Sequence, residues 1–185
     1  MALQIKFGTD GWRAMIAKEF TVDNVARVAQ GTADWVISQD LPKVAVVGHD
    51  CRFGGPLFAE TVAKVFLHNG FEVHLAEGPV TTPMVSLGAK ELNAGIGVII
   101  TASHNPATDN GYKLKGNHGG PLLEADVKAV ETFIPDEITY DLDVISLADY
   151  GSNGKLKTAE LEDMFVEKVE ANFDLNAIRN SDMQF

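Results

Sequence analysis

The most restrictive feature of the sequence is an unbroken apolar run at its centre, Gly95-Ile96-Gly97-Val98-Ile99-Ile100-Thr101. A strand with one face in water would alternate polar and apolar residues, and this run does not alternate. The run therefore predicts a β-strand that is covered on both faces and lies near the centre of a sheet. A sheet of this kind needs helices on both sides, which favours an α/β domain.

Strand-like and helix-like patterns alternate along the rest of the chain. We expect further strands at 44–48, 71–75 and 112–115, and helices at 21–38, 57–69, 82–92, 123–133 and 158–173. Thr21 and Thr158 are candidate N-caps, Pro56 suits a first helical turn, and Asn69-Gly70 suits a helix end. Residues 135–154 are acidic and irregular, and we expect them to form a loop. These elements predict a three-layer α/β/α domain around a small, mostly parallel mixed sheet.

Charge divides the chain into two parts. The whole chain has 26 acidic and 15 basic residues, a formal net charge of −11. Residues 1–133 hold 11 basic and 14 acidic residues, whereas residues 134–185 hold 4 and 12. Nucleic acids and anionic membranes bind basic surfaces, so neither is an expected partner. A pocket for a small anionic ligand is expected in the first part.

This division suggests an organisation into two regions. We interpret residues 1–135 as the core of the domain, and residues 136–185 as an acidic loop and a helix that complete it. We expect that helix to lead to a second domain outside this sequence. The single cysteine, Cys51, rules out an intrachain disulfide, and no signal peptide or membrane-spanning run is evident. A cytoplasmic location is therefore expected.

The residues with reactive side chains directly follow the central strand. Ser103 lies two residues beyond the end of the apolar run. In open α/β sheets, ligands bind outside the carboxyl ends of the strands. Lys113 and Lys115 are two residues apart and would share one side of the next strand. A hydroxyl with cations nearby suits a phosphate, although the same residue types also occur in ordinary loops.

The shape of this loop can be anticipated from local chemistry. Pro106 favours an extended conformation for Asn105, and Asn110-Gly111 predicts a tight turn that returns the chain as a strand. Neighbouring side chains on extended backbone point in opposite directions. We therefore expect that His104 does not serve as the base for Ser103 in a Ser–His catalytic pair.

Three segments resemble motifs of the α-D-phosphohexomutases, the phosphoglucomutase/phosphomannomutase superfamily. Thr-Ala-Ser-His-Asn-Pro at 101–106, followed by Asn-Gly-Tyr-Lys at 110–113, resembles the active-site serine loop of that family. Phe-Gly-Thr-Asp-Gly-Trp-Arg at 7–13 resembles its opening loop, and residues 47–52 are similar to its Gly-x-Asp-x-Arg stretch. Ala14 and His49 depart from the common pattern, in which glycine and arginine are frequent.

The resemblance implies an intramolecular phosphotransferase of the isomerase class with four domains, of which this chain is the first. Ser103 would be a phosphoserine whose phosphate oxygen ligates Mg²⁺. Its phosphoryl group would pass to a hexose phosphate, giving a bisphosphate that reorients and returns its other phosphate to Ser103. The result would be interconversion of hexose 1-phosphate and hexose 6-phosphate, from glucose or mannose.

The resemblance also implies roles for individual residues. Lys113 would lie at the reacting oxygens, and Arg13 would bind the phosphate with its planar fork. His104 would hold the loop or contact phosphate. Asp50 and Arg52 are expected to form a local ion pair that braces the site. The remaining magnesium ligands and the sugar-binding loops would lie in the other domains of the polypeptide, so we expect this chain alone to be inactive.

Other interpretations remain open at this point. A phosphate-binding module without catalysis and a phosphoglucosamine mutase both fit the same motifs. A serine hydrolase is disfavoured because Gly-x-Ser-x-Gly is absent around Ser103, and a P-loop protein because no Gly-Lys-Ser/Thr triplet is present. A zinc module would have to use residues whose spacing fits no common zinc pattern, namely His49, Cys51, His104 and His118.

Overall fold

The computed structural model describes residues 2–9 and 11–182, which fold around one six-stranded sheet in the order β1-β5-β4-β2-β3-β6. The strands are β1 (Trp12–Met15), β2 (Val44–His49), β3 (Glu72–Ala76), β4 (Ile96–Ile100), β5 (Asp109–Gly116) and β6 (Leu156–Ala159). Strands β4, β2, β3 and β6 are parallel, while β5 runs antiparallel to both β4 and β1. The predicted mixed, mostly parallel sheet is therefore confirmed.

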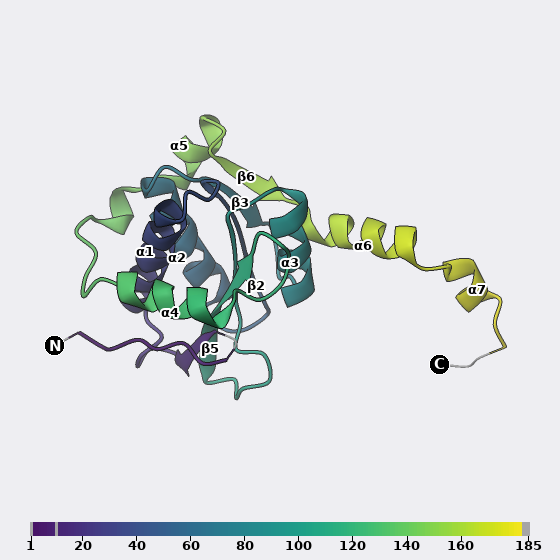
Figure 1. Cartoon of the computed structure of the whole chain (residues 1–185), viewed down its shortest axis with the longest axis horizontal. Helices are drawn as coiled ribbons and strands as arrows, with labels where there is room; N and C mark the ends of the chain where they lie inside the picture. The colour runs from purple at the N-terminus through teal and green to yellow at the C-terminus, as the bar shows by residue number, and fades with distance from the viewer. Residues whose placement is uncertain (1, 10, 183–185) are drawn as a thin grey trace.

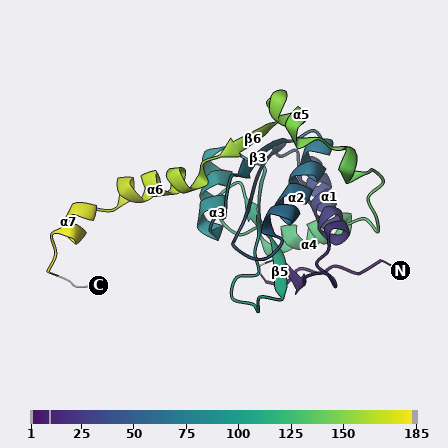
Figure 2. The ribbon, with the colours of Figure 1, turned by 180° about the vertical axis from the view of Figure 1, so that it is seen from behind.

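Helices cover both faces of this sheet (Figure 1). The helices of the described residues are α1 (Val22–Ser38), α2 (Gly55–His68), α3 (Thr82–Glu91), α4 (Glu124–Phe133), α5 (Leu147–Ser152), α6 (Leu161–Asn172) and α7 (Leu175–Arg179), with a 3₁₀ turn at Leu142–Val144. Helices α1, α2 and α4 lie on one face and α3 on the other, as the reverse view also shows (Figure 2). This arrangement confirms the three-layer α/β/α architecture.

The apolar run that dominates the sequence forms the inner strand β4. Every residue of β4 is buried, and its neighbours are β5 and β2. Two apolar clusters cover it, a large one on the side of α1 and α2 and a smaller one on the side of α3. Because parallel β2 and β4 end at the same edge, the loops that follow them are brought together there.

Local signals placed several helix ends correctly. The Thr21 side chain accepts a hydrogen bond from the Asn24 N–H and caps α1, and Pro56 lies in the first turn of α2. Asn69 is the C-cap of α2, and Gly70 follows with a φ of 83°. These ends depend on neighbours in the sequence, which explains why they could be predicted.

Three expectations about secondary structure were wrong or incomplete. Asn110-Gly111 is not a turn but part of β5, where these residues pair with Ala14 and Arg13 of β1. Thr158 is not a helix cap but lies in β6, paired with Leu75, and Glu160 precedes α6. Part of the expected loop at 135–154 is helical. Both β1 and β6 are short edge strands that form only because a distant strand supplies their hydrogen bonds.

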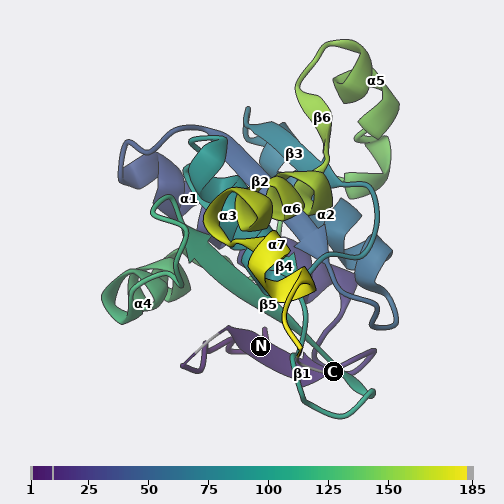
Figure 3. The same cartoon turned by 90° about the vertical axis from the view of Figure 1, so that its right-hand side faces the viewer.

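The C-terminal helices extend away from the sheet. Figure 3, viewed from the side of α3, shows the strands running from β6 at the top to β1 at the bottom, with α6 and α7 in front. Leu161, the first residue of α6, is buried in the smaller apolar cluster. None of the helices in the described part of the chain combines the length and the apolar character that a membrane span requires.

Candidate active site

Ser103 lies in the loop between β4 and β5, which we call the serine loop (residues 101–109). Its side chain is exposed, and its φ of 57° places the backbone in the left-handed region. A residue other than glycine rarely adopts this conformation, which costs about 1–2 kcal/mol. The Ser103 N–H donates to the Thr101 hydroxyl at 3.0 Å, which helps to hold this turn.

The left-handed turn changes the relation between Ser103 and His104. The expectation of an extended backbone here was wrong, because the turn brings the two side chains toward the same side. The Ser103 Oγ and His104 Nδ1 atoms are 3.5 Å apart, at the outer limit of a hydrogen bond. His104 is exposed and lies beside the serine without a short bond to it.

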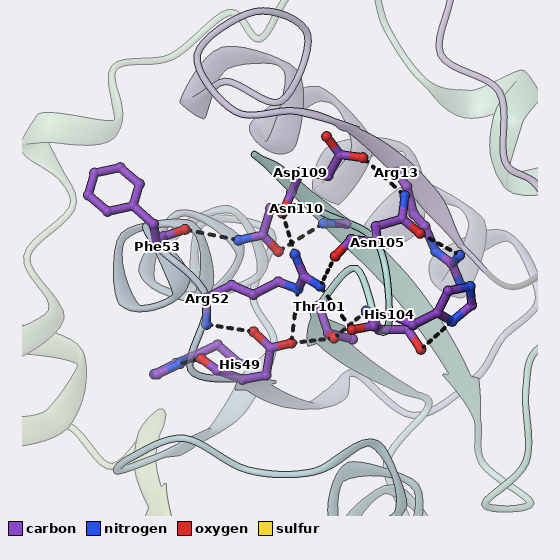
Figure 4. A network of polar contacts seen from close by, with 12 residues as sticks. Arg13, His49, Arg52, Phe53, Thr101, His104, Asn105, Asp109 and Asn110 are labelled. Carbon is purple, nitrogen blue, oxygen red and sulfur yellow. Dashed lines mark hydrogen bonds and ion pairs between the residues drawn. The ribbon is translucent and has the colours of Figure 1, made fainter. Parts of the chain in front are cut away.

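Arg52 forms the densest set of contacts with the serine loop (Figure 4). Its Nη1 atom donates to the carbonyl oxygens of Pro106 at 2.8 Å and Asp109 at 3.0 Å. Its Nη2 atom donates to the carbonyl oxygens of Ser103 at 2.9 Å and Asn105 at 2.6 Å. Sequence reasoning missed these contacts, because no local signal pairs an arginine with carbonyls more than fifty residues away.

Asp50 supports both Arg52 and the start of the serine loop. The predicted ion pair is present, with 3.6 Å between Arg52 Nε and Asp50 Oδ2. The other carboxylate oxygen accepts the Arg52 N–H at 2.9 Å, and Oδ2 also accepts the Thr101 hydroxyl. Asp50 therefore connects the loop after β2 to the loop after β4.

Arg13 approaches the serine loop from β1. Its Nη1 atom donates to the Asn105 side-chain oxygen at 3.1 Å, and Asn105 in turn donates to the Asp109 carboxylate at 3.0 Å. The Arg13 Nε atom is buried and has no hydrogen-bond partner among the described residues. Because Arg13 makes one hydrogen bond with the described residues, through Nη1, further N–H donors on its Nη atoms are left for an anion.

Lys113 and Lys115 lie in β5 on the same face of the sheet as Arg13. Arg13 is directly opposite Gly111, and side chains two residues apart on a strand share one face. Both lysines are buried, with 4% and 3% of their surface exposed. A Cβ atom on Gly11 would lie 2.8 Å from Lys113 Cγ, so the opening loop passes directly over this lysine.

The fold thus brings the three sequence motifs to one edge of the sheet. The opening loop and β1 contribute Arg13, the loop after β2 contributes Asp50 and Arg52, and the serine loop contributes Ser103. A cavity of about 290 Å³ beside Arg13 is lined by Lys6, Gly8, Thr9, Gly11 and Arg13. A second cavity of about 280 Å³ borders Asp50 and Thr101.

The described residues do not form a metal site by themselves. Across residues 2–9 and 11–182, no group of three or more histidine, cysteine, aspartate or glutamate side chains is close enough to hold an ion. The four residues that a zinc module would use are therefore not gathered into such a group. His49 is buried with its Nδ1 atom 2.8 Å from the Asp50 carbonyl oxygen, whereas the His118 ring packs against Gly116 and Gly120.

The chain is thus a three-layer α/β/α domain with Ser103 in an exposed loop at the end of an inner strand. Residues 4–141 match the sequence profile described as phosphoglucomutase/phosphomannomutase, alpha/beta/alpha domain I. The chain therefore belongs to the phosphoglucomutase/phosphomannomutase family.

Several relatives of known name share this domain. A phosphoribomutase of Saccharomyces cerevisiae is 35% identical over 95% of this chain and 30% of its own length. A phosphoglucosamine mutase of Rhodospirillum rubrum is 36% identical over 72% of this chain and 30% of its own length. A crystal structure from Thermus thermophilus, assigned as a phosphomannomutase, superimposes with a TM-score of 0.85 at 33% identity, covering 96% of this chain and 38% of that one. The chain thus spans about a third of the length of these proteins.

Proposed function

We propose that this chain is the phosphoserine-carrying domain of a sugar-phosphate mutase, in which Ser103 accepts and returns a phosphoryl group. The full polypeptide would interconvert hexose 1-phosphate and hexose 6-phosphate through a bisphosphate. The observation that carries the proposal is an exposed Ser103 hydroxyl at the end of the central strand, in a loop that Arg13 contacts through Asn105. The family membership of the chain supports the same conclusion.

The proposed reaction is a direct phosphoryl transfer between two oxygens. As the phosphoryl group leaves Ser103, the bond from phosphorus to the serine oxygen breaks and a bond to a sugar oxygen forms. The sugar hydroxyl loses a proton, and the serine oxygen gains one. Charge spreads over the three remaining phosphoryl oxygens, so catalysis depends on positioning and on cations. When the second phosphate returns, these changes reverse at Ser103.

The side chains around Ser103 suit these demands. We assign Arg13 to the phosphoryl oxygens because a guanidinium can offer two parallel N–H groups to a phosphate. Lys113, on the same face of the sheet, is assigned as a cation at the reacting oxygens and as the group that carries the proton. His104 is assigned a supporting contact with the phosphate because its ring lies beside the serine hydroxyl.

We assign this chain one contribution to the magnesium ion that the family implies, made through the phosphate on Ser103. The described residues offer no cluster of carboxylates, so an oxygen of the Ser103 phosphate would be their contribution to the ion. Other ligands would come from further domains of the same polypeptide. When bound, the ion would offset negative charge on the phosphoryl group.

The choice of sugar is assigned to those further domains as well. The relatives named above are about three times longer than this chain. The phosphoribomutase relative favours pentose phosphates as a second candidate substrate, and the phosphoglucosamine mutase relative favours amino sugars as a third. This chain alone would carry phosphate without completing turnover.

Intact-mass analysis tests the proposal directly. A fraction of the chain purified from cells should already carry the mass of one phosphoryl group. Incubation with glucose 1,6-bisphosphate or ribose 1,5-bisphosphate should increase that fraction. Ser103→Ala should abolish the gain, while Ser152→Ala, at an exposed serine in α5, should leave it unchanged. If neither bisphosphate labels Ser103 in the full-length polypeptide, which supplies the remaining magnesium ligands and the sugar-binding loops, the mutase assignment is wrong. Binding of inorganic phosphate without labelling would then support a non-catalytic phosphate-binding module.

A further inference from the structure

The two arginines beside the serine loop use their donors in opposite ways. A guanidinium has five N–H donors, four of them on the two Nη atoms. In Arg52 the Nη atoms make four hydrogen bonds to loop carbonyls, and Nε faces Asp50. Arg13 has one hydrogen bond to the loop and a buried Nε without a partner among the described residues. Arg52 therefore has no donor left for a substrate, whereas Arg13 does.

We propose that Arg52 is a positioning residue for phosphoryl transfer, which holds Ser103 in its left-handed conformation and so fixes the direction of its hydroxyl. This inference rests on the proposed function. Arg52 would act through the loop backbone and would touch neither the sugar nor the phosphoryl group. Its four acceptors span the serine loop from Ser103 to Asp109, on both sides of Pro106.

The backbone at Ser103 needs such a support. A non-glycine residue in the left-handed region persists only where its surroundings hold it, and such strain is found at reactive sites. The Ser103 carbonyl is held by Arg52, while the Ser103 N–H is held by the Thr101 hydroxyl. That hydroxyl donates to Asp50, and Asp50 also pairs with Arg52. The two peptide groups that define the turn are thus fixed by one connected network.

A lysine could not replace Arg52 in this network. Lysine offers three donors from one atom, whereas the four carbonyl oxygens are met by two nitrogens in a planar fork. Arg52→Lys therefore keeps the positive charge but leaves loop carbonyls without a partner. A purely electrostatic role for Arg52 would survive this substitution, and a positioning role would not.

Arg27 provides a matched control. It also donates to backbone carbonyls, those of Leu3 at 3.0 Å and Pro135 at 2.7 Å, and to the Asn24 side chain at 2.7 Å. These partners lie outside the serine loop. Arg27→Lys should cost comparable hydrogen bonding and stability without changing the conformation of Ser103.

The test measures two quantities in each variant. One is the initial rate at which a hexose bisphosphate phosphorylates Ser103, and the other is the hydrogen-exchange rate of the backbone amides in the serine loop. Arg52→Lys should lower the rate at saturating bisphosphate by about a hundredfold, the loss expected from a small misplacement of a reacting group. Amides of residues 101–109 should exchange faster. Arg13→Lys should instead raise the bisphosphate concentration needed for half-maximal rate. Arg27→Lys should leave both the rate and the loop exchange at the wild-type level.

The outcomes separate this inference from the proposed function. Wild-type rates in Arg52→Lys, or unchanged loop exchange, would overturn the positioning role. If Ser103 accepts no phosphoryl group even in the wild-type full-length polypeptide, the proposed function fails, and hydrogen exchange of the loop amides alone decides whether Arg52 holds Ser103. If Arg52→Lys does not fold, Asp50→Asn is tested in its place. This substitution leaves the four contacts between Arg52 and the loop carbonyls possible, but it weakens the ion pair that orients the Arg52 guanidinium. A loss of about tenfold in rate supports the role, and no loss contradicts it.

Discussion

The serine loop and the C-terminal arm, which we define as residues 161–182, are held in opposite ways. The loop is polar and largely exposed, yet its hydrogen bonds reach residues 51 to 92 positions away in the sequence. The arm has a regular helical pattern, but Leu161 is its only buried residue. Its contact with α3 includes an exposed ion pair of 3.0 Å between Lys168 and Glu91.

A strong local pattern therefore does not imply a strongly held segment. The arm forms helices because its residues favour them, and α6 extends away from the sheet beyond its first turn (Figure 1). The loop has no regular pattern, but distant carboxylate, guanidinium and hydroxyl groups fix it. Reactive residues are commonly found on such loops, supported by a rigid scaffold.

The most damaging change should be Gly111→Ala, next to the serine loop. A Cβ atom there would lie 2.5 Å from the Thr101 carbonyl oxygen and 3.0 Å from that of Trp12. Both are backbone atoms that cannot rotate away, so we expect the free energy of unfolding to fall by about 3 kcal/mol in urea denaturation. Gly78→Ala is the control, because nothing lies within 4 Å of its added Cβ atom. If the two variants had equal free energies of unfolding, the backbone around Gly111 would be able to move away from the added Cβ atom, which would contradict this prediction.

A smaller loss is expected from Leu161→Ala at the base of the arm. Leu161 is 1% exposed and packs against Gly88 of α3. Removing its buried side chain should lower the free energy of unfolding by about 2 kcal/mol and increase proteolysis of the arm. Phe173→Ala, at a position 61% exposed, should change stability by less than about 0.5 kcal/mol. A large loss from Phe173→Ala would mean that the arm is covered in solution.

The mildest change should be Tyr112→Phe beneath the site. Burial raises the pKa of Tyr112 well above its ordinary value of 10, although the hydrogen bond with Thr32 opposes this shift. An unfolded tyrosine would ionise near pH 10 while the folded one stays neutral. The contribution to stability is therefore complete below pH 10 and is lost as pH rises further.

Two measurements follow for this variant. At neutral pH, Tyr112→Phe should cost about 1 kcal/mol, because Thr32 loses its buried hydrogen-bond partner. Above pH 10, its free energy of unfolding should fall less steeply than that of the wild type. Parallel stability curves above pH 10 would contradict the assigned cause of the raised pKa.

Much of the fold and part of the site could be predicted from the sequence. The central strand, the capped start of α1 and the end of α2 depend on apolar runs and on local caps. The apolar run at 95–101 also predicted that Ser103 lies just beyond the central strand. The two-residue period of a strand predicted that Lys113 and Lys115 share one face of β5.

The tertiary structure decided what depends on distant partners. Strands β1 and β6 exist because β5 and β3 offer them free edges, and Asn110-Gly111 becomes strand instead of turn for that reason. The left-handed turn at Ser103 and the four carbonyl contacts of Arg52 could not be predicted from the sequence either. Local order follows from the preferences of neighbouring residues, whereas the shape of the site follows from hydrogen bonds that form only after the chain has folded.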